Sequence, residues 1–193
     1  MKIFNLTEKS QLYTSNAYLV LGSWNTLDDV NTLIDTGSDD AIVQRIESIN
    51  TGLGKRKIDQ VILTHSHSDH TAALKVVKDA YNPAILAFNM HLKNVTQSIG
   101  DGDILKIGDA QFEVFHITAH SYDSVCLFCE TEGILFSGDT TFPIDFENAA
   151  LSEENADVLQ RLAGKKVRIM YPGHGTVRHF THQNFKTIKD KVF

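Results

Sequence analysis

The chain has 193 residues, a net charge of −6 and two cysteines. This length favours one domain, and we expect residues 1–193 to form a single one without disulfides. The acidic balance argues against nucleic acid as a partner, because binding to a phosphate backbone needs a basic surface. No apolar run is long enough to span a membrane, and the N-terminus lacks the apolar region of a signal peptide, so we expect a cytoplasmic protein with no membrane partner.

The first half of the sequence alternates short strands with helices. Strands are expected at Leu12–Leu21, Thr32–Ile34, Ile58–Leu63 and Pro83–Phe88, from their apolar and β-favouring residues. Helices are expected at Asp39–Ile49 and His70–Ala80, because apolar residues recur there on one helical face. Ser38 is the expected N-cap of the first helix.

From Ile104 onward the hydrophobic pattern changes to alternation. Strands are expected at Ile104–Ile107, Phe112–Ile117, Val125–Cys129, Ile134–Phe136 and Val167–Tyr171, with helices at Ser152–Ala163 and His179–Val192. Both halves thus mix strands and helices, which suits two packed sheets with helices outside. The pattern alone leaves a three-layer α/β sheet as a near-equal alternative.

The two cysteines, Cys126 and Cys129, lie in one of these apolar stretches. Because side chains alternate along a strand, a spacing of three places them on opposite faces. We therefore predict two buried structural thiols and neither a disulfide nor a shared metal site.

A cluster of metal-binding side chains follows the strand expected at Ile58–Leu63. The segment is Thr64-His65-Ser66-His67-Ser68-Asp69-His70. On an extended backbone His65 and His67 point the same way, while Asp69 and His70 begin a helix and face a second position nearby. Clustering such groups at the end of an apolar strand costs stability unless something coordinates them. The segment therefore predicts a metal site, with a solvated polar loop as the alternative.

Three later segments repeat this pattern of a strand that ends in a metal-binding residue. They place His120 after Phe115-His116-Ile117-Thr118-Ala119, Asp139 within Ser137-Gly138-Asp139-Thr140, and His174 within Pro172-Gly173-His174-Gly175. Taken singly, each of these three residues has a structural alternative, as an aspartate in a turn or as a histidine hydrogen-bonded to the backbone. Taken together, they supply three more groups able to bind a metal.

In this order the segments resemble the metallo-β-lactamase superfamily, and in particular its glyoxalase II-like branch. The resemblance extends from about Leu12 to Gly175 and implies an α/β fold, a four-layer αβ/βα sandwich with metals at one edge of its two sheets. It implies that the first metal is bound by His65, His67 and His120, the second by Asp69, His70 and His174, and both by Asp139. Asp35, in Ile34-Asp35-Thr36-Gly37, matches an early aspartate that orients one of the ligands in this family; a plain turn residue is the equal alternative.

The resemblance also implies the chemistry of a hydrolase acting on a small molecule. A hydroxide that bridges two divalent metals would attack a carbonyl group, with Asp69 as the catalytic residue that accepts or relays the proton. Zinc is the expected metal, and iron or manganese are alternatives because nitrogen and oxygen donors bind all three. The expected substrate is a thioester, as in hydroxyacylglutathione hydrolases; a lactonase or an iron-dependent persulfide dioxygenase is the alternative.

Two features depart from the family pattern. Thr118-Ala119 replaces the usual Pro-Gly ahead of His120, so Tyr122 in that loop is a candidate pocket residue, with a loop filler as the alternative. Phe142, just after Asp139, is a second candidate for the pocket or for the core. Only residues 176–193 follow Gly175, so we expect the C-terminal helical domain that holds glutathione in that branch to be absent or reduced to one helix.

Overall fold

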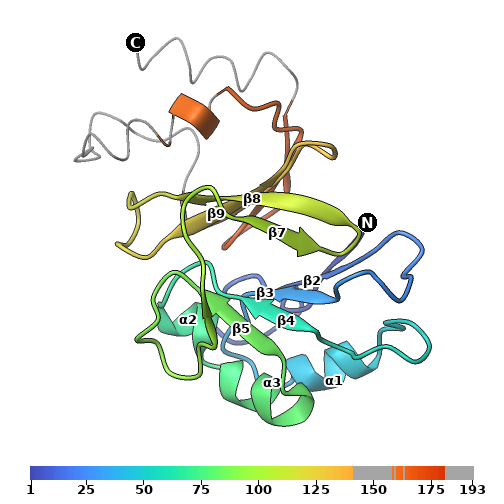
Figure 1. Ribbon diagram of the computed structural model, residues 1–193. Coiled ribbons are helices and arrows are strands. Elements are labelled where there is room, and N and C mark those ends of the chain that lie inside the picture. The colour runs from blue at the N-terminus through green and yellow to red at the C-terminus, as the bar shows by residue number, and fades with distance from the viewer. Residues whose placement is uncertain (141–157, 159, 163, 181–193) are drawn as a thin grey trace.

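A computed structural model of the chain describes residues 1–140, 158, 160–162 and 164–180. Two six-stranded sheets pack face to face, and helices cover the outside of the first sheet (Figure 1). The first sheet has the order β1 (Lys2–Asn5), β2 (Tyr18–Leu21), β3 (Thr32–Ile34), β4 (Gln60–Ile62), β5 (Ala84–Ala87) and β6 (Gln97–Ser98). The second has the order β12 (Arg178–His179), β11 (Ile169–Pro172), β10 (Ile134–Gly138), β9 (Val125–Cys129), β8 (Ala110–His116) and β7 (Ile104–Ile107).

The first sheet is mixed: β1, β2 and β3 are antiparallel, whereas β3 to β6 run parallel. Its crossover helices are α1 (Ile42–Glu47), α2 (Ser68–Thr71) and α3 (Leu74–Tyr81). Successive strand residues face opposite sides, so Leu33 packs towards the helices while Ile34 packs towards the second sheet. Ile46 and Val77 are fully buried on the helical side of the sheet.

The second sheet is antiparallel except for the parallel pair β10 and β11. Its inner face meets the first sheet in a core that includes Phe112, Leu127 and Phe136. Its outer face packs Phe115 and Phe128 against the helical residues Val158 and Leu162. The layers are therefore helix, sheet, sheet and helix, which confirms the expected four-layer sandwich and excludes the three-layer alternative.

The two cysteines behave as predicted. Cys126 lies in the outer core and Cys129 in the core between the sheets, and both are buried free thiols. Burial raises the pKa of the Cys126 thiol to about 12.

Several element boundaries differ from the sequence prediction. Of Leu12–Leu21 only β2 is a strand, because Leu12 and Tyr13 lie exposed in the preceding loop; β1 and β6 were not predicted. The helix expected at His70–Ala80 is interrupted between α2 and α3, where the amide of Ala73 donates to the carbonyl of Gly37.

The first helix begins later than expected, at Ile42. Ser38 is not its N-cap, since the Ser38 hydroxyl donates to the carbonyl of Tyr13. The N-cap position is Ala41, which has no side-chain cap, and its amide donates to the carboxylate of Asp39 in the turn before the helix.

Near the C-terminus, the prediction of a helix beginning at His179 was wrong at its first residue. His179 belongs to the strand Arg178–His179, which pairs with β11. The rest of that predicted helix, residues 181–193, lies outside the described residues. Of Ser152–Ala163, residues 158 and 160–162 are helical and the others also lie outside. Within the described residues, every helix is too short or too polar to cross a membrane.

Candidate metal centre

The structure brings the seven predicted side chains together at one edge of the molecule, where strands of both sheets end. They follow β4 (His65 and His67), lie in α2 (Asp69 and His70), or follow β8, β10 and β11 (His120, Asp139 and His174). Carboxyl ends of strands that run in one direction share one edge of a sheet, which is a usual place for a site. Packing of the two sheets then places both sets of loops opposite each other.

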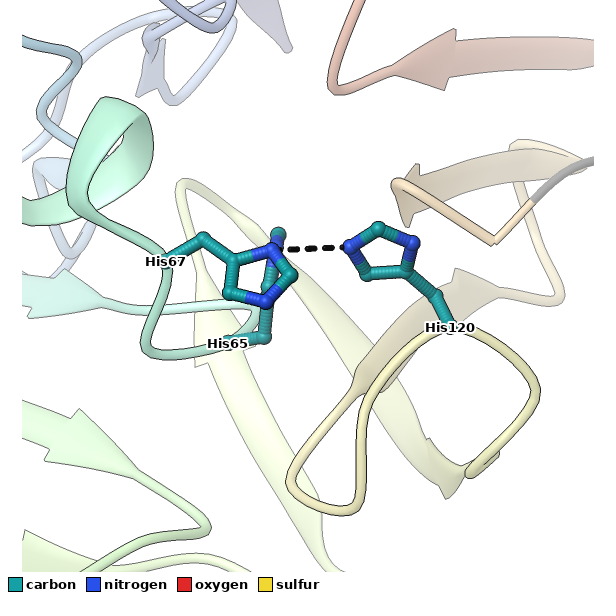
Figure 2. A group of neighbouring side chains, drawn as sticks. All are labelled: His65, His67 and His120. Carbon is teal, nitrogen blue, oxygen red and sulfur yellow. Dashed lines mark hydrogen bonds between the residues drawn. The ribbon is translucent and has the colours of Figure 1, made fainter.

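Three histidines form the first cluster. Nδ1 of His67 lies 3.0 Å from Nε2 of His65 and 3.0 Å from Nε2 of His120. Figure 2 shows the three rings turned towards one another, two from the loop after β4 and the third from the loop after β8. One ligand atom from each lies within 4.8 Å of the others, as a metal ion bound by all three requires.

The second cluster combines carboxylates and histidines. Oδ2 of Asp69 lies 3.0 Å from Nε2 of His174 and 3.9 Å from Nε2 of His70. Asp139 stands between the two clusters, because its Oδ2 is 3.5 Å from Nε2 of His174 and 3.6 Å from Nε2 of His120. Its other oxygen, Oδ1, is 3.1 Å from Nε2 of His70. This position fits a carboxylate shared by two ions.

The charges of the site are arranged around Asp139. Burial opposes ionisation of this carboxyl, but the contact with His70 lowers the pKa of Asp139 to about 2. Burial likewise opposes a charged His70, yet the carboxylates of Asp35 and Asp139 raise the pKa of its imidazole to about 10. Burial and the neighbouring charge of His70 lower the pKa of His65 to about 4, so His65 is neutral near pH 7 and offers a lone pair.

Asp35 fixes the orientation of two of these imidazoles. Its Oδ2 accepts hydrogen bonds from Nδ1 of His70 at 2.8 Å and from the hydroxyl of Thr64 at 2.7 Å. Because the single hydroxyl proton of Thr64 goes to Asp35, the contact of 3.2 Å between Oγ1 of Thr64 and Nδ1 of His65 requires His65 to donate. Both histidines thus carry a proton on Nδ1 and turn Nε2 towards the centre, one in each cluster.

Asp35 adopts a backbone conformation that supports this role over that of a plain turn residue. It has a φ of 55°, in the left-handed region that costs an L residue about 1–2 kcal/mol. Its side chain is buried and makes a third hydrogen bond, from the amide of Thr64. Strain of this kind persists where the surrounding contacts hold it, often at functional sites.

The buried polar atoms of the centre fit a metal ion. Nε2 of His70 and Oδ1 of Asp139 face each other, and each is buried without a hydrogen-bond partner among the described residues. A nitrogen lone pair opposite a carboxylate oxygen needs a cation between them, either a proton or a metal ion. Imidazole nitrogens and carboxylate oxygens in this number are the ligands that zinc and iron bind.

A cavity of about 280 Å³ opens on the centre. It is lined by His120, Gly138, Asp139, Thr140, Met170, Pro172, His174 and Arg178. Tyr122 is not among these residues: it is 63% exposed, and its hydroxyl contacts Asn89. Phe142 lies outside the described residues. Sequence reasoning missed Arg178, which stands in no motif and was placed next to a predicted helix.

Comparisons with known proteins agree with this geometry. The sequence profile of the metallo-beta-lactamase superfamily matches residues 11–174. The thioesterase pkgB of Emericella nidulans is 32% identical over 167 residues, which cover 86% of this chain and 47% of that protein. A hydroxyacylglutathione hydrolase of Idiomarina loihiensis is 29% identical over 111 residues, 57% of this chain and 41% of that protein. Each match therefore spans less than half of the relative's own length.

Among solved structures, the protein TTHA1623 in a di-iron-bound form superposes with a TM-score of 0.66. The superposition covers 93% of this chain and 94% of that one, at 21% sequence identity. At this level of identity the similarity is one of fold.

Proposed function

Because the chain belongs to the metallo-β-lactamase superfamily, we propose that it is a metal-dependent hydrolase with two adjacent ion sites and a thioester substrate. The observation that carries the proposal is the position of the Asp139 carboxylate. It lies within 3.6 Å of nitrogens from His70, His120 and His174, which belong to both clusters. A structural role alone gives no reason to gather so many metal-binding side chains at one point.

In this proposal, His65, His67 and His120 hold the first ion and Asp69, His70 and His174 the second, with Asp139 on both. Bound divalent ions would lower the pKa of a coordinated water towards 7 and polarise a substrate carbonyl. Asp35 and Thr64 hold the Nδ1 side of His70 and His65 and so aim Nε2 of each ring at the ions.

Asp69 is the residue we assign to proton transfer. Its carboxylate stands beside His174 and 18% of its side-chain surface is exposed, so solvent water can reach it. It would accept the proton released by the attacking water and pass it towards the leaving thiolate.

A thioester is supported by the names of the two relatives, a thioesterase and a hydroxyacylglutathione hydrolase. A lactone is the alternative carbonyl substrate. Iron-dependent redox chemistry, such as persulfide oxidation, is the second candidate, because TTHA1623 was crystallised in a di-iron-bound form and this donor set also binds iron. We propose zinc as the metal that supports activity. Because iron is the alternative, the bound metal should be identified in purified protein before any reconstitution.

The test is hydrolysis of S-lactoylglutathione and of an acyl-coenzyme A by zinc-loaded protein. We expect a kcat/KM above about 10⁴ M⁻¹s⁻¹ for one of them, the low end for natural substrates. Asp139→Ala should abolish turnover and lower the bound zinc, because both ions lose a ligand. Asp109→Ala is the matched control, since that carboxylate bonds the amide of Ser23 far from the cavity. Full activity with two zinc ions retained in Asp139→Ala would overturn the assignment of the site.

A further inference from the structure

The segment Tyr13–Tyr18, which leads into β2, connects the two loops that carry the second cluster. It crosses the edge of the molecule between α2 and the turn after β11. The amide of Ser15 donates to the carbonyl of Asp69 at 3.1 Å. The ring of Tyr13 stacks on that of His174, with centroids 5.7 Å apart and planes inclined by 23°. One short segment therefore touches both Asp69 and His174.

Asn16 makes most of the contacts to the turn that carries His174. Its backbone amide donates to the carbonyl of Gly173 at 2.6 Å. Its side-chain amide donates to the carbonyls of Pro172 and Gly175, each at 2.9 Å. These carbonyls come from residues on both sides of His174, so one side chain holds the turn before and after the imidazole.

Other groups hold Asn16 itself and the same turn. Oδ1 of Asn16 accepts a hydrogen bond from the side-chain amide of Asn5 at 2.9 Å, which fixes the direction of the Asn16 amide. The buried hydroxyl of Tyr18 donates to the carbonyl of Pro172 at 2.8 Å. Two side chains of one segment thus converge on the carbonyl of Pro172.

The first cluster lacks this support. Across the described ranges 1–140 and 164–180, no hydrogen bond or ring contact joins Tyr13–Tyr18 to the rings of His65, His67 or His120. The segment therefore acts on one cluster of the pair.

We propose that Asn16 is a positioning residue for the second ion site. It holds the turn 172–175 so that Nε2 of His174 stays beside Asp69 and Asp139, and thereby sets the affinity for the second ion independently of the first. The inference rests on the proposed metal centre. It adds that binding of the second ion depends on the hydrogen bonds of Asn16, a residue that lies more than 150 positions before the turn in the sequence.

The experiment compares Asn16→Ala with Asn31→Ala. Asn31 is a matched control, because its side-chain amide also donates to two loop carbonyls, those of Thr51 and Arg56, on a different loop. Zinc is titrated into metal-free protein by calorimetry, and bound zinc is counted by elemental analysis. We expect Asn16→Ala to weaken the second zinc by about 10–100-fold, the usual cost of losing a residue that orients a ligand, and to leave the first unchanged. Asn31→Ala should bind two zinc ions as the wild type does.

A double mutant identifies which ion is affected. His174→Ala removes the second site directly, so adding Asn16→Ala to it should cost no further zinc affinity. Tyr18→Phe is a milder change that keeps the buried ring and removes one hydrogen bond to Pro172, and we expect a smaller loss at the same site. It also keeps the inference testable if Asn16→Ala fails to fold.

Three results would overturn the inference: two zinc ions with wild-type affinities in folded Asn16→Ala, equal weakening of both sites, or the same loss in Asn31→Ala. If Asn16→Ala does not fold, unchanged zinc binding in Tyr18→Phe would overturn it. A wild-type protein that binds no zinc or iron would instead refute the proposed metal centre, and the inference with it.

Discussion

Gly173 lies against the centre of the proposed site, and its replacement by alanine is the most informative single change. A β-carbon at this position would lie 2.1 Å from Oδ1 of Asp139 and 2.8 Å from Cε1 of His70. The backbone cannot yield easily, because the amide of Gly173 donates to Gly138 and its carbonyl accepts from Asn16. The carboxylate must therefore move, by about 1 Å, a displacement that costs on the order of 100-fold in rate.

The matched control for Gly173→Ala is the same change at Gly102, which belongs to no part of the site. Gly102 has a φ of 82° and nothing within 4 Å of an added β-carbon. Gly102→Ala therefore costs about 1–2 kcal/mol of backbone strain without touching the site. Overpacking at Gly173 costs about 1–3 kcal/mol, so the two variants should lose similar stability.

The assay follows urea unfolding, bound zinc and thioester turnover in both variants. We expect comparable unfolding midpoints, with zinc and turnover lost in Gly173→Ala alone. If Gly173→Ala keeps two zinc ions and turns over within threefold of Gly102→Ala, the Asp139 carboxylate is not the shared ligand and the reasoning fails.

Two further substitutions and one labelling experiment test other parts of the molecule. Arg178→Gln should raise KM about tenfold for a glutathione thioester but not for a neutral N-acetylcysteamine thioester, because Arg178 is the cationic residue among those that line the cavity. Arg168→Gln is the control, and equal effects on both substrates would contradict this. Asparagine also adopts the left-handed backbone conformation of Asp35, so Asp35→Asn should keep the fold. We expect it to weaken zinc binding about 10–100-fold in titrations, and an unchanged affinity would contradict the role of Asp35 in orienting the ligands. Cys126 and Cys129 should react with a thiol reagent only after unfolding, and labelling of native protein would contradict their burial.

Elements with a strong local signal were predicted accurately. Ile104–Ile107 and Val125–Cys129 form the strands expected from apolar runs bounded by turn residues. The candidate ligands were found for a similar reason, since each group of them lies in the loop or short helix that follows an apolar strand, and these strand ends share an edge. Such signals depend on neighbours in sequence.

Features that depend on distant partners were missed. The break in the helix expected at His70–Ala80 arises because Ala73 bonds to the carbonyl of Gly37. Leu12 and Tyr13 suggested a strand by composition, but the Thr7 hydroxyl bonds the carbonyl of Ser15 and helps hold this stretch as a loop. The support of Asn16 for the turn around His174 joins residues at opposite ends of the chain, and no local pattern marks it.

The candidate ligands come from both halves of the molecule, with residues 65–70 from the first sheet and His120, Asp139 and His174 from the second. Ions held between them would therefore tie the two sheets together, much as a cross-link closes a loop of about 100 residues. Their binding free energy then adds to the free energy of folding, by about 4 kcal/mol when free metal exceeds the dissociation constant a thousandfold. Metal supply would thus govern how long the folded chain survives heat and proteases, as well as how fast it works.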